Sequence, residues 1–324
     1  MHSISELQDT IKKAFNPASF AHEPLELYDP IIYTLDLGGK RLRPLLVLLG
    51  CDLFGGNIEK ALPAAIAIEL FHNFTLLHDD IMDKAPLRRG NETVYRKWNT
   101  SVAILSGDTM FALACEYISQ VDPDVLPLAL SEFTHTARLV CEGQQYDMSF
   151  ETRKVVNIID YIEMIRLKTA VLIGCSLRLG AILAKAPPDD TAAIYSFGEN
   201  IGLAFQLQDD LLDVFGNEQK FGKEIGGDIL SGKKTFLLLK AYEIASPGER
   251  SELDQCFSDR SMPGKEKITR VKKVYQSLMI REITLDKIEK YFSKGLQSLD
   301  NIHADEDSKK MLVSFANELL KRDF

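Results

Sequence analysis

Two short acidic clusters contain the residues best suited to chemistry. Each has the form DDxxD and follows an apolar stretch of helical periodicity: Asp79-Asp80-Ile81-Met82-Asp83 and Asp209-Asp210-Leu211-Leu212-Asp213. In a helix, the first and last aspartates of such a cluster lie one turn apart on the same face, where like charges repel. A hard cation resolves this repulsion, and oxygen-rich sites suit Mg²⁺. One such cluster fits a solvated helix end equally well, but two matching clusters favour metal binding.

Basic residues near these clusters predict that the ligand is a polyanion. They occur in Gly38–Pro44 (GGKRLRP), in Arg88-Arg89, at Lys168 and at Lys223 and Lys233. Arginine binds phosphate oxygens in a bidentate manner, and lysine binds them as a point charge. Two acid clusters together with several cations therefore predict two diphosphate groups bound in one cavity.

The composition limits the class of protein. The 324 residues have a net charge of −9, which disfavours nucleic acid and anionic membranes as partners. The longest apolar run, Pro44–Cys51, is far too short for a membrane span, and the first residues do not resemble a secretory signal. Five widely spaced cysteines without a CxxC pair indicate thiols in a reducing cytoplasm.

The elements that must position these side chains are predicted to be helices. Apolar residues recur at three- and four-residue spacing through most of the chain, and no alternating strand pattern is present. The predicted helical segments are Leu62–Met82, Val102–Ser119, Leu126–Tyr146, Tyr161–Ala184, Thr191–Val214, Thr235–Ile244, Lys265–Leu278, Leu285–Leu299 and Lys309–Leu320. Without a linker-like stretch, the sequence predicts a single all-α domain over residues 1–324.

Several motifs together resemble one known family. GGKRLRP, LLHDDIMD followed by RRG, the Lys168-Thr169 pair, and FQLQDDLLD followed by GK and GGDI are similar to the trans-isoprenyl diphosphate synthases. The resemblance implies a helical bundle around a central active-site cavity (the isoprenoid synthase type I fold), usually as a homodimer. It also implies head-to-tail condensation of an allylic diphosphate with isopentenyl diphosphate, with three Mg²⁺ ions bridging both acid clusters and the allylic diphosphate.

The resemblance also implies a role for each motif residue. Asp79, Asp83 and Asp209 would bind Mg²⁺ directly, and Asp80, Asp210 and Asp213 through waters. Arg88, Lys168, Lys223 and Lys233 would hold the allylic diphosphate, and Lys40, Arg43, His72 and Arg89 would hold isopentenyl diphosphate. Thr169 and Gln206 would point dipoles at the developing carbocation, with Lys168 and Lys223 completing the catalytic set. Gln144 and Asp147 match positions that line the pocket.

Product length is expected to depend on residues that precede the first acid cluster. In the family the fourth and fifth positions before the motif influence length, and here they are Thr75 and Phe74. A helical wheel places Phe71 about 80° from Asp79 but Phe74 about 140° away, so the wheel and the family rule disagree on Phe74. A large Phe74 beside a small Thr75 predicts a twenty-carbon product, geranylgeranyl diphosphate, with fifteen-carbon farnesyl diphosphate as the alternative.

Three other functions fit fewer of the motifs. His72 and His78-Asp79 suggest an HD-type metal phosphohydrolase, but none of the other histidines has an acidic neighbour that matches this motif, and Asp209–Asp213 has no role in it. A terpene cyclase needs neither GGKRLRP nor a second full DDxxD. A non-catalytic subunit of a prenyl synthase would be expected to have lost acidic motifs, and both are intact.

Overall fold

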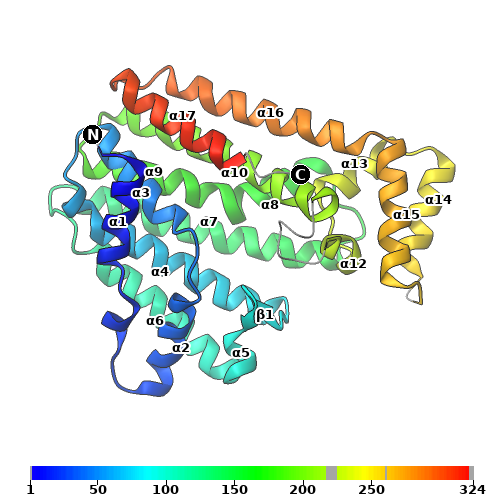
Figure 1. Ribbon diagram of the computed structural model, residues 1–324, viewed down its shortest axis with the longest axis horizontal. Coiled ribbons are helices and arrows are strands. Elements are labelled where there is room, and N and C mark those ends of the chain that lie inside the picture. Colours follow the sequence, from blue (N-terminus) through cyan, green and yellow to red (C-terminus); the bar gives the residue numbers. More distant parts are fainter. Residues whose placement is uncertain (1, 217–224, 260, 321–324) are drawn as a thin grey trace. The chain divides into compact units, whose positions relative to one another are not determined.

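The computed structural model describes residues 2–216, 225–259 and 261–320, and helices dominate these ranges (Figure 1). The N-terminal elements are α1 (Ile4–Ala14), η1 (Pro17–Phe20), α2 (Leu25–Asp36), α3 (Leu42–Leu53), α4 (Ile58–Met82), β1 (Leu87–Arg88), β2 (Asn91–Glu92), α5 (Val94–Lys97) and α6 (Thr100–Ile118). Then follow α7 (Leu126–Thr152), α8 (Ile158–Ile165), the π-helical turn η2 (Arg166–Ala170), α9 (Val171–Leu183) and α10 (Pro188–Phe215). The last are α12 (Gly227–Ser231), α13 (Phe236–Ile244), α14 (Pro247–Ser258), α15 (Gly264–Ser277), α16 (Ile280–Leu299) and α17 (Glu306–Leu320).

The all-α prediction is confirmed. Eight of the nine predicted segments each coincide with one helix, within six residues at the ends, whereas Tyr161–Ala184 covers α8, η2 and α9 in succession. Several helices lay outside the predicted set, among them α1 and α14. Both begin with a capping box, Ser3 with Glu6 and Ser246 with Glu249, in which the two side chains satisfy each other's backbone N–H groups. That signal is readable in the sequence and would have predicted both helices.

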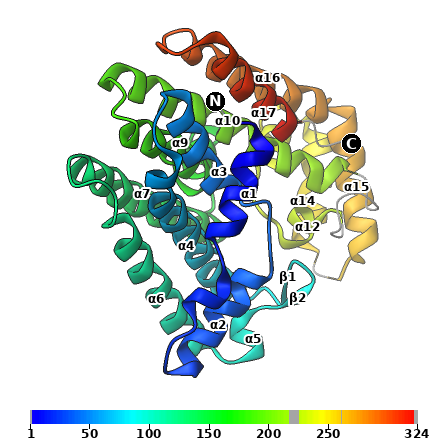
Figure 2. The same ribbon diagram turned by 60° about the vertical axis from the view of Figure 1, so that its left-hand side comes forward.

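A two-stranded hairpin follows α4 directly. Strands β1 and β2 pair Leu87 with Glu92 and Arg88 with Asn91, so Arg89-Gly90 forms the two-residue turn (Figure 2). Arg89 and Gly90 both have positive φ, 52° and 78°, as a type I′ turn requires. The strands are too short for an alternating pattern, which is why the periodicity of the sequence could not reveal them.

The chain divides into two compact units. The first comprises residues 1–137, 175–194 and 303–308, and the second comprises residues 138–174, 195–302 and 309–324. Helices α7, α9 and α10 contribute residues to both units. The first acid cluster belongs to the first unit and the second cluster to the second unit, and each unit is described by itself below.

In the first unit, α4 packs against α3 and α6, and the part of α9 in this unit packs on α3. The backbones of α3 and α9 approach so closely that glycine is required on both. A Cβ atom on Gly50 would lie 2.2 Å from the Leu177 carbonyl oxygen, and one on Gly180 would lie 2.1 Å from that of Val47. This contact holds α3, which begins within GGKRLRP, in the core of the unit.

In the second unit, the core forms where the described parts of α8, α10, α13, α15 and α16 meet. Its buried side chains include Leu207, Leu237, Leu253 and Tyr275, each at most 1% exposed. Helices α14 and α15 lie side by side and add Leu253, Cys256 and Tyr275 to it (Figure 1). Helix α10 contributes an apolar face to this core, and the second acid cluster lies near its C-terminal end.

The α3–α9 contact predicts opposite results for two Gly→Ala substitutions. We expect Gly180→Ala to lower the free energy of unfolding by about 1–3 kcal/mol or more, because the added methyl group clashes with the α3 backbone. Gly248→Ala, in the exposed first turn of α14 with open space around it, is the control and should be neutral or stabilise by up to about 1 kcal/mol. Urea unfolding of both variants measures the difference; equal effects would contradict the packing argument.

Candidate functional site

The first acid cluster lies at the C-terminal end of α4. Asp79 and Asp80 are in its last turn and Asp83 is its C-cap, with the Asp83 N–H donating to the Asp79 carbonyl oxygen at 2.8 Å. Asp79 and Asp83 are therefore one helical turn apart, as predicted. The partial negative charge of a helix C-terminus adds to the repulsion between them. This arrangement favours a cation at the cluster.

The middle aspartate of this cluster is buried and bound by the hairpin. Asp80 is 5% exposed, and Arg88 on β1 donates from Nε to both of its carboxylate oxygens at 2.8 Å and from Nη2 to Oδ1 at 2.7 Å. Nη2 also lies 3.9 Å from Asp79 Oδ2. Burial raises the pKa of Asp80 above its ordinary value, while the bonds from Arg88 oppose that shift. Arg88, predicted to hold a diphosphate, thus lies within the acid cluster and fixes its geometry.

Three of the four predicted isopentenyl diphosphate ligands meet beside the Gly38–Pro44 loop. Arg43 Nη1 lies 3.0 Å from His72 Nε2, and Arg89 donates to the Gly38 carbonyl oxygen. A Cβ atom on Gly39 would lie 2.8 Å from the Arg89 guanidinium, so only glycine permits this approach. The fourth ligand, Lys40, extends from the same loop and is exposed.

His72 is held in its neutral form. Burial lowers its pKa well below the ordinary value, and the positive charges of Arg43, Arg89 and Arg88 lower it further. A neutral imidazole can accept a hydrogen bond at Nε2 from the Arg43 guanidinium. His72 therefore orients Arg43 without adding a charge of its own.

The second acid cluster lies near the end of α10, and its middle aspartate is also buried. Asp210 is 5% exposed; it accepts a hydrogen bond from Tyr161 Oη at Oδ2 and one from Gln206 Nε2 at Oδ1, at 3.0 Å. Gln206 Oε1 in turn accepts from Thr169 Oγ1 at 3.0 Å. Burial raises the pKa of Asp210 to about 8, helped by the negative charge of Asp228. The predicted Thr169 and Gln206 therefore belong to one network with Asp210.

Lys168 and Thr169 lie in the π-helical turn η2, between α8 and α9. Such turns insert one residue into a helix and are frequent at functional sites. Lys168 Nζ lies 2.6 Å from Asp147 Oδ2 on α7, and Gln144 precedes Asp147 by one turn. A Cβ atom on Gly143 would lie 2.3 Å from the Lys168 backbone nitrogen, so glycine lets η2 approach α7. The structure thus pairs Lys168 with Asp147, and the role of Gln144 and Asp147 in lining the pocket stays a prediction.

The last aspartate of the second cluster anchors the GGDI segment. The Gly226 N–H donates to the Asp213 carbonyl oxygen at 2.6 Å, and the Asp228 N–H donates to Asp213 Oδ2 at 3.0 Å. Lys233 follows this segment, is exposed, and donates its backbone N–H to the Asp228 carbonyl oxygen at 2.9 Å. The predicted ligand Lys223 lies outside the described residues.

The donor set suits Mg²⁺ if substrate oxygens complete the coordination. Among the described residues, no group of three or more His, Cys, Asp or Glu side chains is placed to hold a metal ion by itself. Mg²⁺ commonly keeps several waters and takes one or two carboxylates plus substrate phosphates. A pair of carboxylates one turn apart in each cluster provides that kind of partial site.

The predicted chain-length residues differ in their surroundings. Phe71 is 1% exposed, whereas Phe74 and Thr75 are half-buried. The Phe74 ring contacts Phe71 at 5.7 Å and Phe111 of α6 at 5.5 Å between centroids. Phe74 therefore belongs to an aromatic group on one side of α4, and the group also includes His78 and Phe133.

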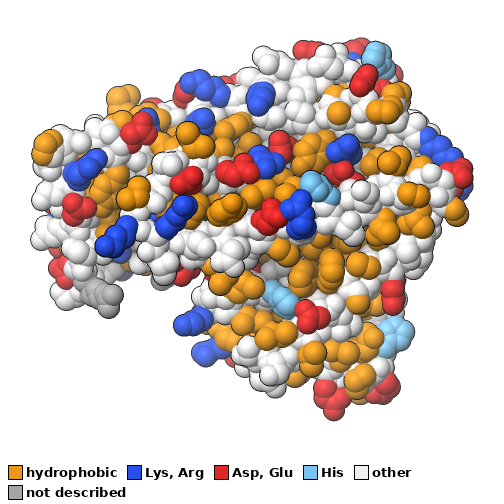
Figure 3. All heavy atoms as spheres, turned by 180° about the vertical axis from the view of Figure 1, so that it is seen from behind, with side chains coloured by type: hydrophobic (Ala, Val, Ile, Leu, Met, Phe, Trp, Pro, Cys, Tyr) orange, Lys and Arg blue, Asp and Glu red, His pale blue; other side chains and the backbone are white. Residues whose placement is uncertain are grey.

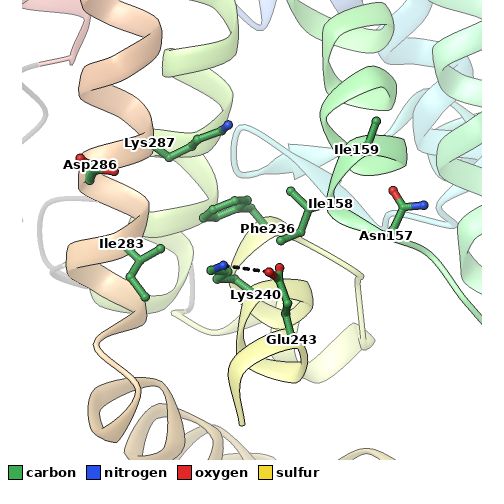
Figure 4. A pocket seen from close by; sticks show the side chains of 9 residues that line it. All are labelled: Asn157, Ile158, Ile159, Phe236, Lys240, Glu243, Ile283, Asp286 and Lys287. Atoms are coloured by element: carbon green, nitrogen blue, oxygen red, sulfur yellow. Dashed lines mark hydrogen bonds and ion pairs between the residues drawn. The ribbon is translucent and has the colours of Figure 1, made fainter.

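A separate cavity of about 470 Å³ lies in the second unit and contains none of the predicted site residues. Ile158, Phe236 and Ile283 form its apolar part, and Lys240 and Glu243 pair at 3.1 Å at its edge (Figure 4). Its charged residues are two lysines, one aspartate and one glutamate, with no excess of either sign. The lining therefore lacks the excess of positive charge that would favour a diphosphate.

Sequence reasoning missed Tyr161, Asp228 and Glu69 as parts of these networks. In the sequence, Tyr161 fits the apolar positions of a helix face. Its polar role becomes evident only from the hydrogen bond that its hydroxyl group donates to Asp210. Asp228 belongs to the GGDI motif, which was quoted for the resemblance but given no role of its own. Glu69, which accepts a hydrogen bond from Arg41, is the lone carboxylate of the apolar stretch Ala61–Leu77 of α4, and that exception to the pattern was its signal.

Comparison with known proteins places these motifs in a family. The polyprenyl synthetase family model matches residues 24–278. A geranylgeranyl pyrophosphate synthase of Geoglobus acetivorans is 40% identical over 93% of this chain and 92% of its own length. A crystal structure of a geranylgeranyl pyrophosphate synthase is 44% identical over the full length of both chains, with a TM-score of 0.94. A polyprenyl synthase structure from Caulobacter crescentus, complexed with calcium and isoprenyl diphosphate, is 27% identical over 99% of this chain and 96% of its own, with a TM-score of 0.88.

The raised pKa of Asp210 predicts a pH dependence of stability. Asp210 loses its proton at about pH 8 in the fold and near 3.8, its ordinary value, in the unfolded chain. Between these values only the unfolded chain gives up the proton, so a rise in pH lowers the free energy of unfolding. The asparagine of Asp210→Asn does not titrate in this range. We therefore expect the free energy of unfolding to fall between pH 5 and pH 8 by at least about 1 kcal/mol less in this variant than in wild type.

The measurement is denaturant unfolding in metal-free buffer across that pH range. The exposed Asp286→Asn serves as the control and should follow wild type. Parallel curves for wild type and Asp210→Asn would contradict the prediction.

Proposed function

Because the chain belongs to the polyprenyl synthetase family, we propose that it is a Mg²⁺-dependent trans-prenyltransferase that condenses an allylic diphosphate with isopentenyl diphosphate. The observation that carries this proposal is common to both acid clusters. In each, the middle aspartate is bound by the protein's own donors, Arg88 for Asp80 and Tyr161 with Gln206 for Asp210. The first and last aspartates of each cluster lie one turn apart. Of these, Asp79, Asp83 and Asp209 are the carboxylates proposed to bind metal directly, whereas Asp213 accepts the Asp228 N–H at Oδ2.

The proposed roles follow the chemistry of each group. Asp79, Asp83 and Asp209 would hold Mg²⁺ directly, with three ions expected beside the allylic diphosphate. Bound Mg²⁺ supplies positive charge that stabilises the departing diphosphate. Arg88, Lys168, Lys223 and Lys233 hold the allylic diphosphate, and Lys40, Arg43, His72 and Arg89 hold isopentenyl diphosphate.

The developing allylic cation needs electron-rich oxygens that do not attack it. Thr169 and Gln206 supply such dipoles, and their mutual hydrogen bond of 3.0 Å, together with the bond from Gln206 to Asp210, fixes their orientation. The π-helical turn presents Thr169 directly beside Lys168, so one turn serves both the carbocation and the diphosphate. No enzyme nucleophile is required, because the double bond of isopentenyl diphosphate attacks the cation.

The direct test is incubation with Mg²⁺, isopentenyl diphosphate and each allylic primer. We expect elongated prenyl diphosphates from wild type and a loss of kcat/KM of about a hundredfold or more in Asp79→Asn and Asp209→Asn, since each removes a metal-binding charge. The exposed Asp286→Asn should retain full activity. Diphosphate release without an elongated product would refute the synthase function in favour of hydrolysis.

We propose geranylgeranyl diphosphate as the main product, with farnesyl diphosphate as the alternative. The geranylgeranyl synthases among the similar proteins support the longer product. Phe74 supports a short product. Its ring packs against Phe71 and Phe111, so it cannot easily move aside for a longer prenyl chain.

Removing this ring should lengthen the product. We expect Phe74→Ala to extend the main product by at least one five-carbon unit, because the side chain that limits the cavity is truncated. Phe257→Ala, which removes a ring that contacts Lys267 in the second unit, is the matched control and should leave the length unchanged. Thin-layer chromatography of dephosphorylated products reports the outcome, and an unchanged length in Phe74→Ala would reject this role.

A homodimer is also part of the proposal. Large apolar side chains are exposed in the first unit, with Leu105 of α6 at 58% and Leu128 of α7 at 64%, and the face in Figure 3 shows further hydrophobic patches. Among the described helices, α6 alone meets the length and hydropathy of a membrane span, which core helices of soluble proteins meet as well. In a homodimer, a second copy of the chain would cover these apolar side chains, which would explain their exposure in a single copy.

The free cysteines support a reducing location. All five are unbonded, and Cys51, Cys175 and Cys256 are buried, so we place the enzyme in the cytoplasm. The family match runs through both compact units, which supports one functional domain over residues 1–324.

A further inference from the structure

Arg41, the central residue of GGKRLRP, binds the protein itself. Its backbone adopts the left-handed conformation, with φ 44°, at the N-cap of α3. Nη1 donates to Glu69 Oε1 and Nη2 to the Leu35 carbonyl oxygen, each at 2.5 Å, and the guanidinium lies 4.5 Å from the centre of the Phe15 ring. With three protein contacts and a side chain only 18% exposed, Arg41 is built into the fold.

Glu69 is an exception in an apolar stretch of α4. It is 3% exposed, and besides Arg41 it accepts a hydrogen bond from Asn73 Nδ2 at 2.9 Å. Removing one partner of a buried ion pair leaves an uncompensated charge and costs several kcal/mol, whereas replacing both with apolar groups is often neutral. The pair therefore contributes little net stability, so stability alone does not explain why an ion pair lies at this position.

The pair joins the loop to one turn of α4 that also carries His72. Glu69, His72 and Asn73 are spaced so that they lie on neighbouring positions of the helix surface. Arg41 contacts Glu69, and two residues later Arg43 contacts His72 at 3.0 Å. The strained backbone of Arg41 follows Lys40 and precedes Arg43 by two residues. The backbone conformation at Arg41 therefore affects the direction of both side chains.

We propose that the Arg41–Glu69 pair is a positioning device that sets Lys40 and Arg43 for the diphosphate of isopentenyl diphosphate. The inference rests on the proposed function. Arg41 itself does not contact the substrate; it fixes the loop through Glu69 and the Leu35 carbonyl group. Loss of the pair should weaken binding of isopentenyl diphosphate and leave the allylic substrate, held by other residues, unaffected.

The experiment separates positioning from stability by removing the pair in two ways. Arg41→Met alone leaves Glu69 buried without its cation and should lower the melting temperature. Arg41→Met with Glu69→Leu removes both charges and should restore most of that loss. If the pair positions the loop, the double variant still shows a KM for isopentenyl diphosphate raised about tenfold, with kcat and the KM for the allylic primer within about twofold of wild type.

Arg41→Lys provides an independent measurement, whether or not the double variant folds. Lysine keeps the charge but cannot donate to Glu69 and the Leu35 carbonyl oxygen from one planar fork. We expect a KM for isopentenyl diphosphate raised about fivefold, and binding of that substrate measured by calorimetry should weaken to the same extent. An unchanged KM in this variant overturns the proposal.

The matched control is a second partly buried Arg–Glu pair of the first unit, Glu132 with Arg178 at 3.1 Å, which joins α7 to α9. Arg178→Met with Glu132→Leu should leave both KM values as in wild type. A double variant at Arg41 and Glu69 that is stable with a wild-type KM, or that raises both KM values equally, overturns the positioning role. If the wild-type protein forms no elongated product, the proposed function fails and this inference fails with it.

Discussion

The burial of one carboxylate in each acid cluster is the constraint on which the candidate site depends. A carboxylate leaves water at a high cost unless donors replace its hydration. Asp80 obtains them from an arginine, and Asp210 from a tyrosine and an amide. Burial raises the pKa of both carboxyl groups. At Asp80 the bonds and charge of Arg88 oppose this shift, whereas at Asp210 the negative charge of Asp228 adds to it and the pKa reaches about 8. Each cluster is thus held rigidly at its centre while its outer aspartates retain their spacing.

Small residues and short irregular elements deliver the partners of these carboxylates. The Arg89-Gly90 turn brings Arg88 back to Asp80, and Gly39 admits the Arg89 side chain beside the loop. In the second unit, a Cβ atom on Gly202 would lie 2.7 Å from Ala170 Cα, so glycine lets α10 approach η2 and places Gln206 within reach of Thr169. Helices provide the framework, and the irregular positions set the contacts.

The sequence was sufficient for the long helices that carry the acid clusters, whereas α1 and α14, among others, lay outside the predicted set, and the roles given to the site residues stay predictions. Periodicity predicted α4 and α10, and the DDxxD spacing predicted aspartates one turn apart, because both depend on local geometry alone. The partner of a buried group depends on which segments meet in three dimensions, so neither Tyr161 nor Glu69 could be assigned. Arg88 shows the same limit: its charge predicted an anion, and the anion it contacts in the structure is Asp80.

The π-helical turn at Arg166–Ala170 has a consequence for how the chain can change. Such a turn amounts to a helix with one additional residue. Deleting one residue between Arg166 and Ala170 would convert the turn into ordinary α-helix and leave α8 and α9 in their present orientation, because the turn accommodates that one additional residue. Lys168 and Thr169 would then face new directions while the helix stayed intact. The stretch could therefore lose a residue without breaking the helix, but not without changing where Lys168 and Thr169 point, so its length is constrained by these two side chains and not by helix stability.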